Sequence, residues 1–315
     1  MTQPVYLSDQ HLAQLGVTPV DIADAIEAAL KEKAAGDLQT TPKAALLPGD
    51  GRYVMSTLAV GSGSVIVVKT VGVFPGNAAI GIPAINGAIQ VLDAKTGLLR
   101  AVVDANWITA VRTAALSAVA ARRLANPESE TIAFVGCGVQ AHSHLDAFRE
   151  MFPLKRVLAV GRSKPPVDAF CEHASKLGFE AAPSDPDEAL AQADIIVTSV
   201  TLDYSIEPFL DAEALKPGAF AAITDLFIPW HDASVSAFGT IIVDDIEQER
   251  TAEKPMVPFD LVNDDLTGLI GRDDLVWSGR ERAAFVFRGI ALGDYAAARL
   301  VVERAAQAGI GLRLN

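Results

Sequence analysis

The sequence predicts an α/β protein in which a doubly wound parallel sheet is joined to an N-terminal α+β segment. Three observations lead to this fold class. After about residue 126, short apolar runs alternate with helical segments, which is typical of parallel βαβ units. Before it, alternating apolar runs are separated by Gly, Pro, Asn and Asp, which favours an antiparallel or mixed sheet. A glycine-rich turn also joins one short strand to the helix that follows it.

Composition and charge exclude several classes of protein. The 315 residues carry 26 Lys and Arg against 39 Asp and Glu, a formal charge of −13, and half of them are apolar. This apolar content excludes a disordered chain, and the acidic charge argues against nucleic acid as a partner. We expect no secretory signal, because the opening MTQPVYLSDQHLAQLG has no basic start followed by an apolar core. We expect no membrane span, because the longest uncharged stretch, 70–92, contains helix-breaking prolines. The two cysteines lack metal-ligand spacing, so we predict no metal site and a cytoplasmic location.

The N-terminal part begins with a helical pattern from residue 7 to about 36. Five apolar runs follow it: KAALLP, RYVMSTLAV, SVIVVKTVGVF, GAIQVLD and LLRAVVD. Residues 93–97 (DAKTG) form a hairpin turn between the last two runs, and residues 105–125 form an alanine-rich helix with a basic last turn. The pattern predicts a sheet flanked by helices.

The second part contains five main predicted strands and the helices between them. The strands are expected at 131–135, 156–160, 194–200, 220–223 and 240–243, with helices near 166–177 and 186–191. A last helix is expected over about 282–308 and has the Ala, Leu and Arg character of residues 105–125. We therefore predict a first domain of residues 1–125 with residues 290–315, and a second domain of residues 126–289.

The turn Gly136-Cys137-Gly138-Val139-Gln140-Ala141 matches G-x-G-x-x-[G/A] and predicts a Rossmann-type dinucleotide-binding domain. Gly136 permits the tight turn, Gly138 allows a pyrophosphate to approach the backbone, and Ala141 keeps helix and strand close. Val139 and Gln140 open the helix whose N-terminus attracts phosphate. The alternative is an ordinary strand-to-helix turn built from small residues.

The end of the next strand predicts which dinucleotide binds. It reads Val160-Gly161-Arg162-Ser163-Lys164, without the acidic residue that usually holds the ribose hydroxyls of NAD. Because a guanidinium can bind a 2′-phosphate with two hydrogen bonds, Arg162 and Ser163 predict NADP(H), with NAD(H) possible. The alternative is a solvated basic loop. We also expect Ser199 and Val200, at the end of the run 194–200, to contact the cofactor.

Lys69 and Arg112 are single cations in otherwise apolar segments. Burying such a charge without a partner costs several kcal/mol, so each side chain must meet an anion or open onto a cavity. Two such cations suit a small anionic substrate, with Arg112 binding its carboxylate and Lys69 transferring a proton. The alternative pairs each cation with a buried Asp or Glu.

Several motifs in order resemble the ornithine cyclodeaminase/mu-crystallin family. They are the run Lys69–Ala121, the turn GCGVQA, VDD at 243–245 and the closing FVFRGIALGDYAAARLVVERA. The resemblance implies an N-terminal sheet domain that dimerises, a Rossmann domain, and a substrate bound in the cleft between them. It also implies that Lys69 and Arg112 handle the substrate carboxylate and a proton.

Two positions depart from the family pattern. Lys43 stands where the family usually has a second arginine, so carboxylate binding loses a planar, two-point contact. The aspartate that cyclodeaminases use for the substrate amino groups falls near Phe227, with Asp225 just upstream. Asp225 is therefore a candidate catalytic residue, or it caps the loop.

The resemblance, with these departures, favours an NADPH-dependent reductase that converts an imino acid, such as a cyclic ketimine carboxylate, to an amino acid by hydride transfer. The alternatives are an NAD-dependent ornithine cyclodeaminase, an alanine-type amino-acid dehydrogenase, and a non-enzymatic NADPH-binding protein. The expected partners are a small amino or imino acid and a second copy of the chain.

Overall fold

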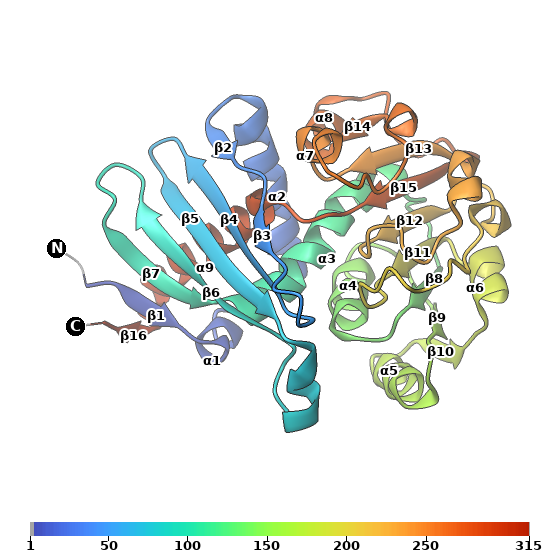
Figure 1. Ribbon diagram of the computed structural model, residues 1–315, viewed down its shortest axis with the longest axis horizontal. Coiled ribbons are helices and arrows are strands. Elements are labelled where there is room, and N and C mark those ends of the chain that lie inside the picture. Colours follow the sequence, from blue (N-terminus) through green and yellow to red (C-terminus); the bar gives the residue numbers. More distant parts are fainter. Residues whose placement is uncertain (1–2, 315) are drawn as a thin grey trace. The chain divides into compact units, whose positions relative to one another are not determined.

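The computed structural model describes residues 3–314, and the chain divides into two compact units (Figure 1). Unit 1 comprises Met1–Arg112 and Gly289–Asn315, and unit 2 comprises Thr113–Arg288. The boundary falls inside helix α3 (Ala105–Leu124), whereas the sequence places it after residue 125. The last part of the chain returns to unit 1, where it adds a helix and a short strand.

Unit 1 contains a sheet of eight strands. Seven follow the order β16 (Leu312–Arg313), β1 (Val5–Leu7), β7 (Leu99–Asp104), β6 (Ile85–Asp93), β5 (Val65–Val73), β4 (Tyr53–Gly61) and β2 (Leu38–Thr40), and β3 (Ala44–Leu46) also pairs with β4. All pairs are antiparallel except β1 with β7. A short 3-10 helix, η1 (Pro75–Ile80), lies between β5 and β6.

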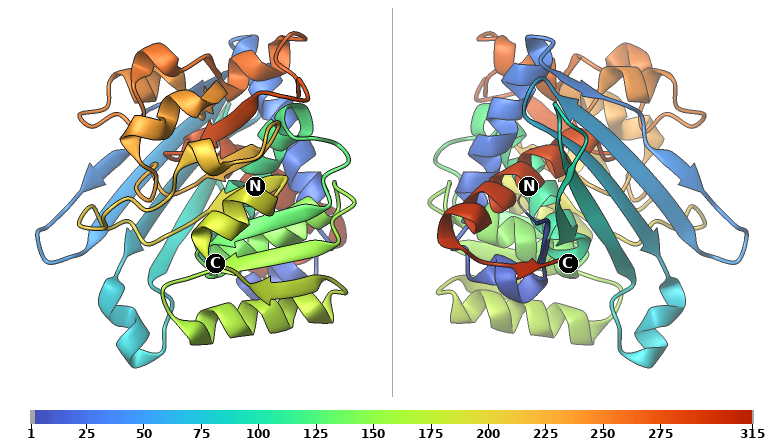
Figure 2. Two further views of the ribbon diagram at one scale, coloured as in Figure 1. Left: turned by 90° about the vertical axis from the view of Figure 1, so that its right-hand side faces the viewer. Right: turned by 90° about the vertical axis from the view of Figure 1, so that its left-hand side faces the viewer.

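Helix α9 (Ala291–Ala308) packs against β4, β5 and β6 and against α2 (Pro19–Ala34), and it crosses one face of the sheet (Figure 2). The strands follow the expected alternation, since Val67, Lys69 and Val71 of β5 point to this buried face. On the other face, Leu58 and Val60 of β4 are exposed. One side of the sheet is therefore a protein core, and apolar side chains remain on the other.

The expectation of one helical pattern over residues 7–36 is wrong in detail. Residues 5–7 form β1, which pairs with β7, and two helices follow: α1 (Asp9–Ala13) and α2. Gly16, with φ of 60°, lies between them. A capping box at Thr18, with proline at the next position, then starts α2.

Unit 2 contains a second sheet of eight strands, all of whose pairs are parallel. Their order is β10 (Glu180–Pro183), β9 (Arg156–Val160), β8 (Thr131–Val135), β11 (Ile195–Thr198), β12 (Phe220–Ile223), β15 (Arg282–Val286), β13 (Phe238–Val243) and β14 (Asp264–Asp265). The chain runs outward from β8 to β10 and then returns to β11 on the other side of β8. The order therefore reverses between β8 and β11, which is where doubly wound sheets bind ligands.

Helices connect the strands of unit 2. They are α4 (Val139–Arg149), α5 (Lys164–Lys176), α6 (Pro186–Gln192), α7 (Ile246–Arg250) and α8 (Leu266–Gly271), with short 3-10 helices at Ala212–Ala214, Asp232–Ala237 and Phe259–Leu261. The predicted α/β class, with its doubly wound parallel sheet and N-terminal α+β unit, is confirmed.

The expected helix over residues 282–308 is wrong for its first part. Residues 282–286 form β15 in the interior of the parallel sheet, between β12 and β13, and α9 begins only at Ala291. After Arg282 the run AAFV is short and apolar, and such a run has no periodicity that separates a buried strand from a buried helix, so the pattern alone could not decide.

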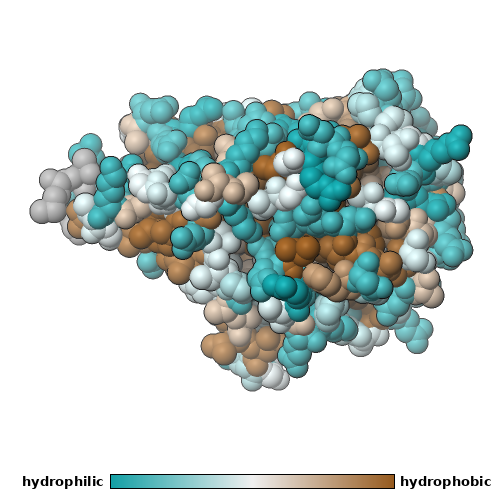
Figure 3. Space-filling model, turned by 90° about the horizontal axis from the view of Figure 1, so that it is seen from above, coloured by the Kyte–Doolittle hydropathy of each residue, from teal (hydrophilic) through white to brown (hydrophobic). Residues whose placement is uncertain are grey.

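No helix within residues 3–314 is both long enough and apolar enough to cross a bilayer. Apolar side chains nevertheless reach the surface in several patches among hydrophilic ones (Figure 3).

Candidate functional site

Lys69 and Arg112, both in unit 1, meet at one carboxylate. Lys69 projects from the buried face of β5 and is 1% exposed, and its Nζ donates a hydrogen bond of 2.7 Å to Oδ1 of Asp294. The Nε of Arg112, on α3, forms an ion pair of 3.2 Å with the same oxygen. Asp294 lies in the first turn of α9, where the helix dipole favours a negative charge.

The other carboxylate oxygen of Asp294 is also held. Oδ2 accepts a hydrogen bond of 3.1 Å from Oγ1 of Thr57, on the neighbouring strand β4. Thr57 and Lys69 are directly opposite in the β4–β5 register, so both side chains reach α9 from adjacent strands. The carboxylate is therefore fixed from three sides.

Burial, together with the positive charges of Arg112 and Lys43, lowers the pKa of Lys69 to about 8, while Asp294 opposes this shift. Lys43 precedes β3 and lies with its Nζ 6.0 Å from the centre of the Tyr53 ring. These four groups comprise three cations and one anion. An arginine and lysines placed together can bind the carboxylate of a small acid.

The alternative interpretation of Lys69 and Arg112, a buried acidic partner, is therefore realised in part. The two cations do have a buried acidic partner, but they share one carboxylate instead of having one each. Whether they bind substrate stays a prediction. Asp294 and Thr57 were not identified from the sequence, where Asp294 is 225 residues from Lys69.

In unit 2, the glycine turn joins β8 to α4 as predicted. Gly136 has φ of 97°, and a Cβ there would lie 2.6 Å from the carbonyl oxygen of Ser199, so only glycine fits. A Cβ on Gly138, the N-cap of α4, would meet no atom within 4 Å.

The first turn of α4 is open to a ligand. No side chain caps it, and Val139 at its first position is 68% exposed, whereas Ala141 is buried against the unit. Oε1 of Gln140 is buried and has no hydrogen-bond partner within residues 3–314. Since free N–H groups and a helix dipole bind phosphate, these residues fit a dinucleotide.

Ser199 and Val200 follow β11, next to the glycine turn. The Ser199 Oγ donates a hydrogen bond of 3.3 Å to the Gly136 carbonyl, and the Val200 N–H donates one of 3.0 Å to Oδ2 of Asp225. Thr198 Oγ1 donates to the other oxygen of Asp225, at 2.9 Å. Asp225 thus ties the ends of β11 and β12 together.

Asp225 is fully buried, and burial raises its pKa to about 7 against the lowering effect of these two hydrogen bonds. Leu226 and Phe227, which follow it, have φ of 59° and 66°, a left-handed conformation that is strained for side chains of this size. Such strain is common at functional sites, so this loop is a candidate part of the site. The catalytic role of Asp225 stays a prediction.

Arg162 and Ser163 are exposed after β9, and Ser163 is the N-cap of α5 without a side-chain hydrogen bond to it. Asp203, which follows β11, is an acidic group near Arg162. Hydrogen bonds from Ser205 lower the pKa of Asp203, and the positive charge of Arg162 also lowers it. Sequence reasoning found no carboxylate here because Asp203 follows β11 and not β9.

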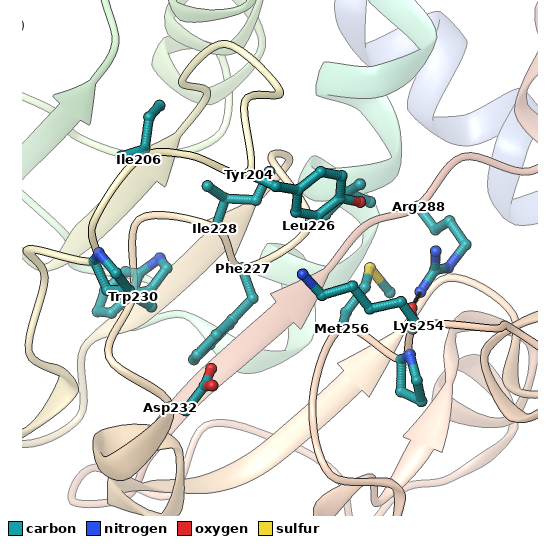
Figure 4. A pocket seen from close by; sticks show the side chains of 12 residues that line it. Tyr204, Ile206, Leu226, Phe227, Ile228, Trp230, Asp232, Lys254, Met256 and Arg288 are labelled. Atoms are coloured by element: carbon teal, nitrogen blue, oxygen red, sulfur yellow. Dashed lines mark hydrogen bonds between the residues drawn. The ribbon is translucent and has the colours of Figure 1, made fainter. Parts of the chain in front are cut away.

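A cavity of about 230 Å³ lies within unit 2, at the carboxyl ends of four neighbouring strands (Figure 4). Its walls include Tyr204 after β11, Phe227 after β12, Lys254 after β13 and Arg288 after β15. The Nζ of Lys254 lies 4.1 Å from the centre of the Tyr204 ring. Arg288 donates to the Lys254 carbonyl and pairs with Glu249. Tyr204 and Lys254 belong to no motif in the sequence, whereas Arg288 lies in the closing family motif and Phe227 is where the family aspartate would fall.

The chain matches the model of the ornithine cyclodeaminase/mu-crystallin family over residues 8–225, more than half of its length, and it belongs to that family. It is 28% identical to the alanine dehydrogenase of Archaeoglobus fulgidus over 305 residues, which are 93% of this chain and 92% of that protein. It is 36% identical to the ketimine reductase mu-crystallin of Mus musculus over 154 residues. That match covers 49% of this chain and 48% of the mouse protein, so it spans about half the length of that relative.

A solved structure described as an archaeal alanine dehydrogenase dimer with bound NAD superposes with a TM-score of 0.89. Its sequence is 25% identical, and the match covers 100% of this chain and 99% of that one. The family predicted from the sequence is therefore confirmed.

Proposed function

We propose that this member of the family is an NADPH-dependent oxidoreductase that reduces an imino acid to an amino acid. One observation carries the proposal: in unit 1 two buried cations, Lys69 and Arg112, share the carboxylate of Asp294, while unit 2 presents a turn suited to a dinucleotide. In this proposal unit 1 binds the substrate and unit 2 binds the cofactor. The mouse relative is named a ketimine reductase, which supports the same chemistry.

The chain's own residues bind and orient the acid. Arg112 and Lys43 supply the positive charge for the carboxylate, and burial of the cluster strengthens that attraction. Lys69, with its pKa near 8, is mainly protonated at neutral pH and donates a proton to the imine nitrogen, directly or through water. The bound nicotinamide supplies the hydride for the adjoining carbon.

For the cofactor, we propose a preference for NADP(H), with Arg162 and Ser163 binding the 2′-phosphate. The glycine turn and the α4 N-terminus hold the pyrophosphate, with Ser199 and Val200 beside it. The solved alanine dehydrogenase contains NAD, so the relative affinity of the two dinucleotides is the point to measure.

Arg162→Asp tests this preference. It is expected to weaken NADPH binding at least tenfold more than NADH binding, because a phosphate would then face carboxylates at positions 162 and 203. Asp203→Asn is the matched control, and it is expected to strengthen NADPH binding. An equal loss of both cofactors in Arg162→Asp would contradict the assignment.

The cavity at the carboxyl ends of β11, β12, β13 and β15 is proposed to receive the nicotinamide half of the cofactor. Ligands of doubly wound sheets bind outside the carboxyl ends of the strands. The cavity lies at the same sheet edge as the glycine turn, and its aromatic wall fits a flat ring.

Ornithine cyclodeamination is the second candidate, and it requires a carboxylate for the substrate's amino groups. Asp225 is the candidate for that task, but Thr198 and Val200 already occupy both of its oxygens. This observation favours the reductase. Alanine-type dehydrogenation uses the same hydride step and is separated only by its substrate.

One assay distinguishes these activities. Purified protein is mixed with NADPH and, in separate reactions, cyclic ketimine carboxylates, pyruvate with ammonia, and pyruvate with methylamine. Loss of NADPH absorbance with a cyclic ketimine is expected. Ammonia release from ornithine with catalytic NAD, without NADPH consumption, would select the cyclodeaminase. Tight NADPH binding without either reaction would indicate a non-enzymatic role.

We also propose that the chain forms a homodimer in the cytoplasm, where its two free cysteines would stay reduced. The exposed Leu58 and Val60 on the open face of the unit 1 sheet support self-association, and the solved alanine dehydrogenase is a dimer. Sedimentation should give twice the chain mass, and Val60→Lys should give monomer. A monomeric wild type would contradict the proposal.

A further inference from the structure

Asp294 is the carboxylate that Lys69 and Arg112 share in unit 1, and the proposed reaction assigns it no task. It is 1% exposed and touches Lys69, Arg112 and Thr57 through its two oxygens. It belongs to α9, whereas its partners come from β5, α3 and β4. A single side chain therefore links four elements of the unit at the place where the acid is proposed to bind.

Geometry limits what Asp294 can do. Its Oδ1 is shared by the Lys69 ammonium at 2.7 Å and the Arg112 Nε at 3.2 Å, so both cations lie around one oxygen atom. Without that oxygen, two like charges at this separation would repel each other in a buried setting and move apart. The Thr57 hydroxyl fixes the other oxygen and so prevents the carboxylate from rotating.

We propose that Asp294 is the positioning residue of this centre: its carboxylate keeps the Lys69 ammonium beside the Arg112 guanidinium, so that a small carboxylic acid meets both cations in one fixed arrangement. The inference rests on the proposed function for the nature of the acid. The contacts that carry it are independent of any turnover.

Neutralising Asp294 has two opposite expected effects on the affinity for a carboxylate, one from the lost charge and one from the lost positioning. Asp294→Asn removes a negative charge from an anion site, so electrostatics alone would tighten the binding of a carboxylate. Loss of position would weaken it, because the two cations would no longer converge. The direction of the change in affinity therefore decides between the two effects.

The test uses pyrrole-2-carboxylate, a planar cyclic acid that is not an imine, and measures its affinity by calorimetry at pH 6, where Lys69 of wild type is protonated. For Asp294→Asn we expect binding at least tenfold weaker than wild type. Equal or tighter binding would overturn the proposal. Because the assay needs no turnover, its result is distinct from failure of the proposed reductase activity.

Two further variants keep the test decisive if Asp294→Asn fails to fold. Thr57→Val leaves every charge in place and removes only the hydrogen bond to Oδ2, and we expect severalfold weaker binding. Asp294→Glu keeps the charge but displaces the carboxylate on a longer side chain, and we expect binding weaker than wild type. Wild-type affinity in Thr57→Val and Asp294→Glu together would also overturn the proposal.

A pH titration supplies a readout that a purely structural role would not move. The charged groups around Lys69 are Lys43, Arg112 and Asp294, and only Asp294 favours the protonated amine. Asp294→Asn should therefore lower the pH at which ¹⁵N-labelled Lys69 titrates by at least one unit, whereas Thr57→Val should leave it unchanged. Lys69→Met identifies the signal. An unchanged titration in Asp294→Asn would refute the assignment.

Discussion

Replacing Lys69 by methionine removes the ammonium at the centre of the proposed reaction while nearly preserving the volume of a fully buried side chain. Two losses follow. The substrate carboxylate loses one of three nearby cations, and a unit charge about 4 Å away at an effective dielectric of 20 is worth about 4 kcal/mol. The imine nitrogen loses its proton donor, which typically contributes about 10²–10⁴ in rate. Since the two losses overlap, we expect kcat/KM to fall by about 10³ or more.

The assay follows NADPH oxidation with a cyclic ketimine carboxylate, and NADPH affinity is measured separately by fluorescence. Affinity for NADPH should stay within about twofold of wild type, because the glycine turn and Arg162 lie in unit 2. Lys43→Met is the matched control: it removes a cation from the same cluster, so it should raise KM more than it lowers kcat. A Lys69→Met enzyme within about tenfold of wild-type kcat/KM would refute the role of Lys69 as proton donor.

Three other outcomes are expected. Gly136→Ala should lower the melting temperature and abolish the stabilisation that NADPH gives, since its Cβ would lie 2.6 Å from the Ser199 carbonyl oxygen. An NADPH-induced shift in melting temperature equal to that of wild type would contradict the role of this turn in binding the cofactor. Because burial raises the pKa of Asp225 to about 7, above its value of about 3.9 in an unfolded chain, the wild type loses stability as pH rises from about 4 to 7. Asp225→Asn should not show this loss of stability, so urea unfolding should show the variant becoming more stable relative to wild type between pH 5 and pH 8. A difference in unfolding free energy that is the same at both pH values would contradict the raised pKa of Asp225. The triple variant Lys69→Met, Arg112→Met, Asp294→Leu should unfold at no lower denaturant concentration than wild type yet fail to bind pyrrole-2-carboxylate, whereas a large loss of stability would show that the cluster is structural.

The sequence predicted the parallel sheet well because its strands carry two independent signals. Residues 131–135 and 156–160 are short, mostly apolar runs followed by helical patterns, and the glycine turn marks where the first of these strands ends. The errors fall where one signal stood alone. Residues 283–286 are apolar and are not followed by a turn signal until Gly289, and residues 7–36 contain a break at Gly16 that hydrophobic spacing does not show.

Residues of the cationic cluster could be predicted only where a charged residue stands in an otherwise apolar segment. Lys69 and Arg112 stand out as charges in apolar segments, so the sequence indicates that they need an anion. It does not indicate which anion, because Asp294 lies in a helix with other charged residues and has no unusual neighbours. Asp203 was missed for a similar reason: its approach to Arg162 depends on the order of the strands, which places β11 beside β8.

The energetics of the cluster explain why we interpret it as a binding site. Taking Lys69, Arg112 and Asp294 out of water costs several kcal/mol for each ion, and their mutual attraction in a buried site often fails to offset this cost. Apolar side chains of similar size in place of a buried ion cluster often give a protein that is equally stable or more stable. Buried ions that add little net stability, and that perturb one another's titration, are the property expected of a site that binds a small acid.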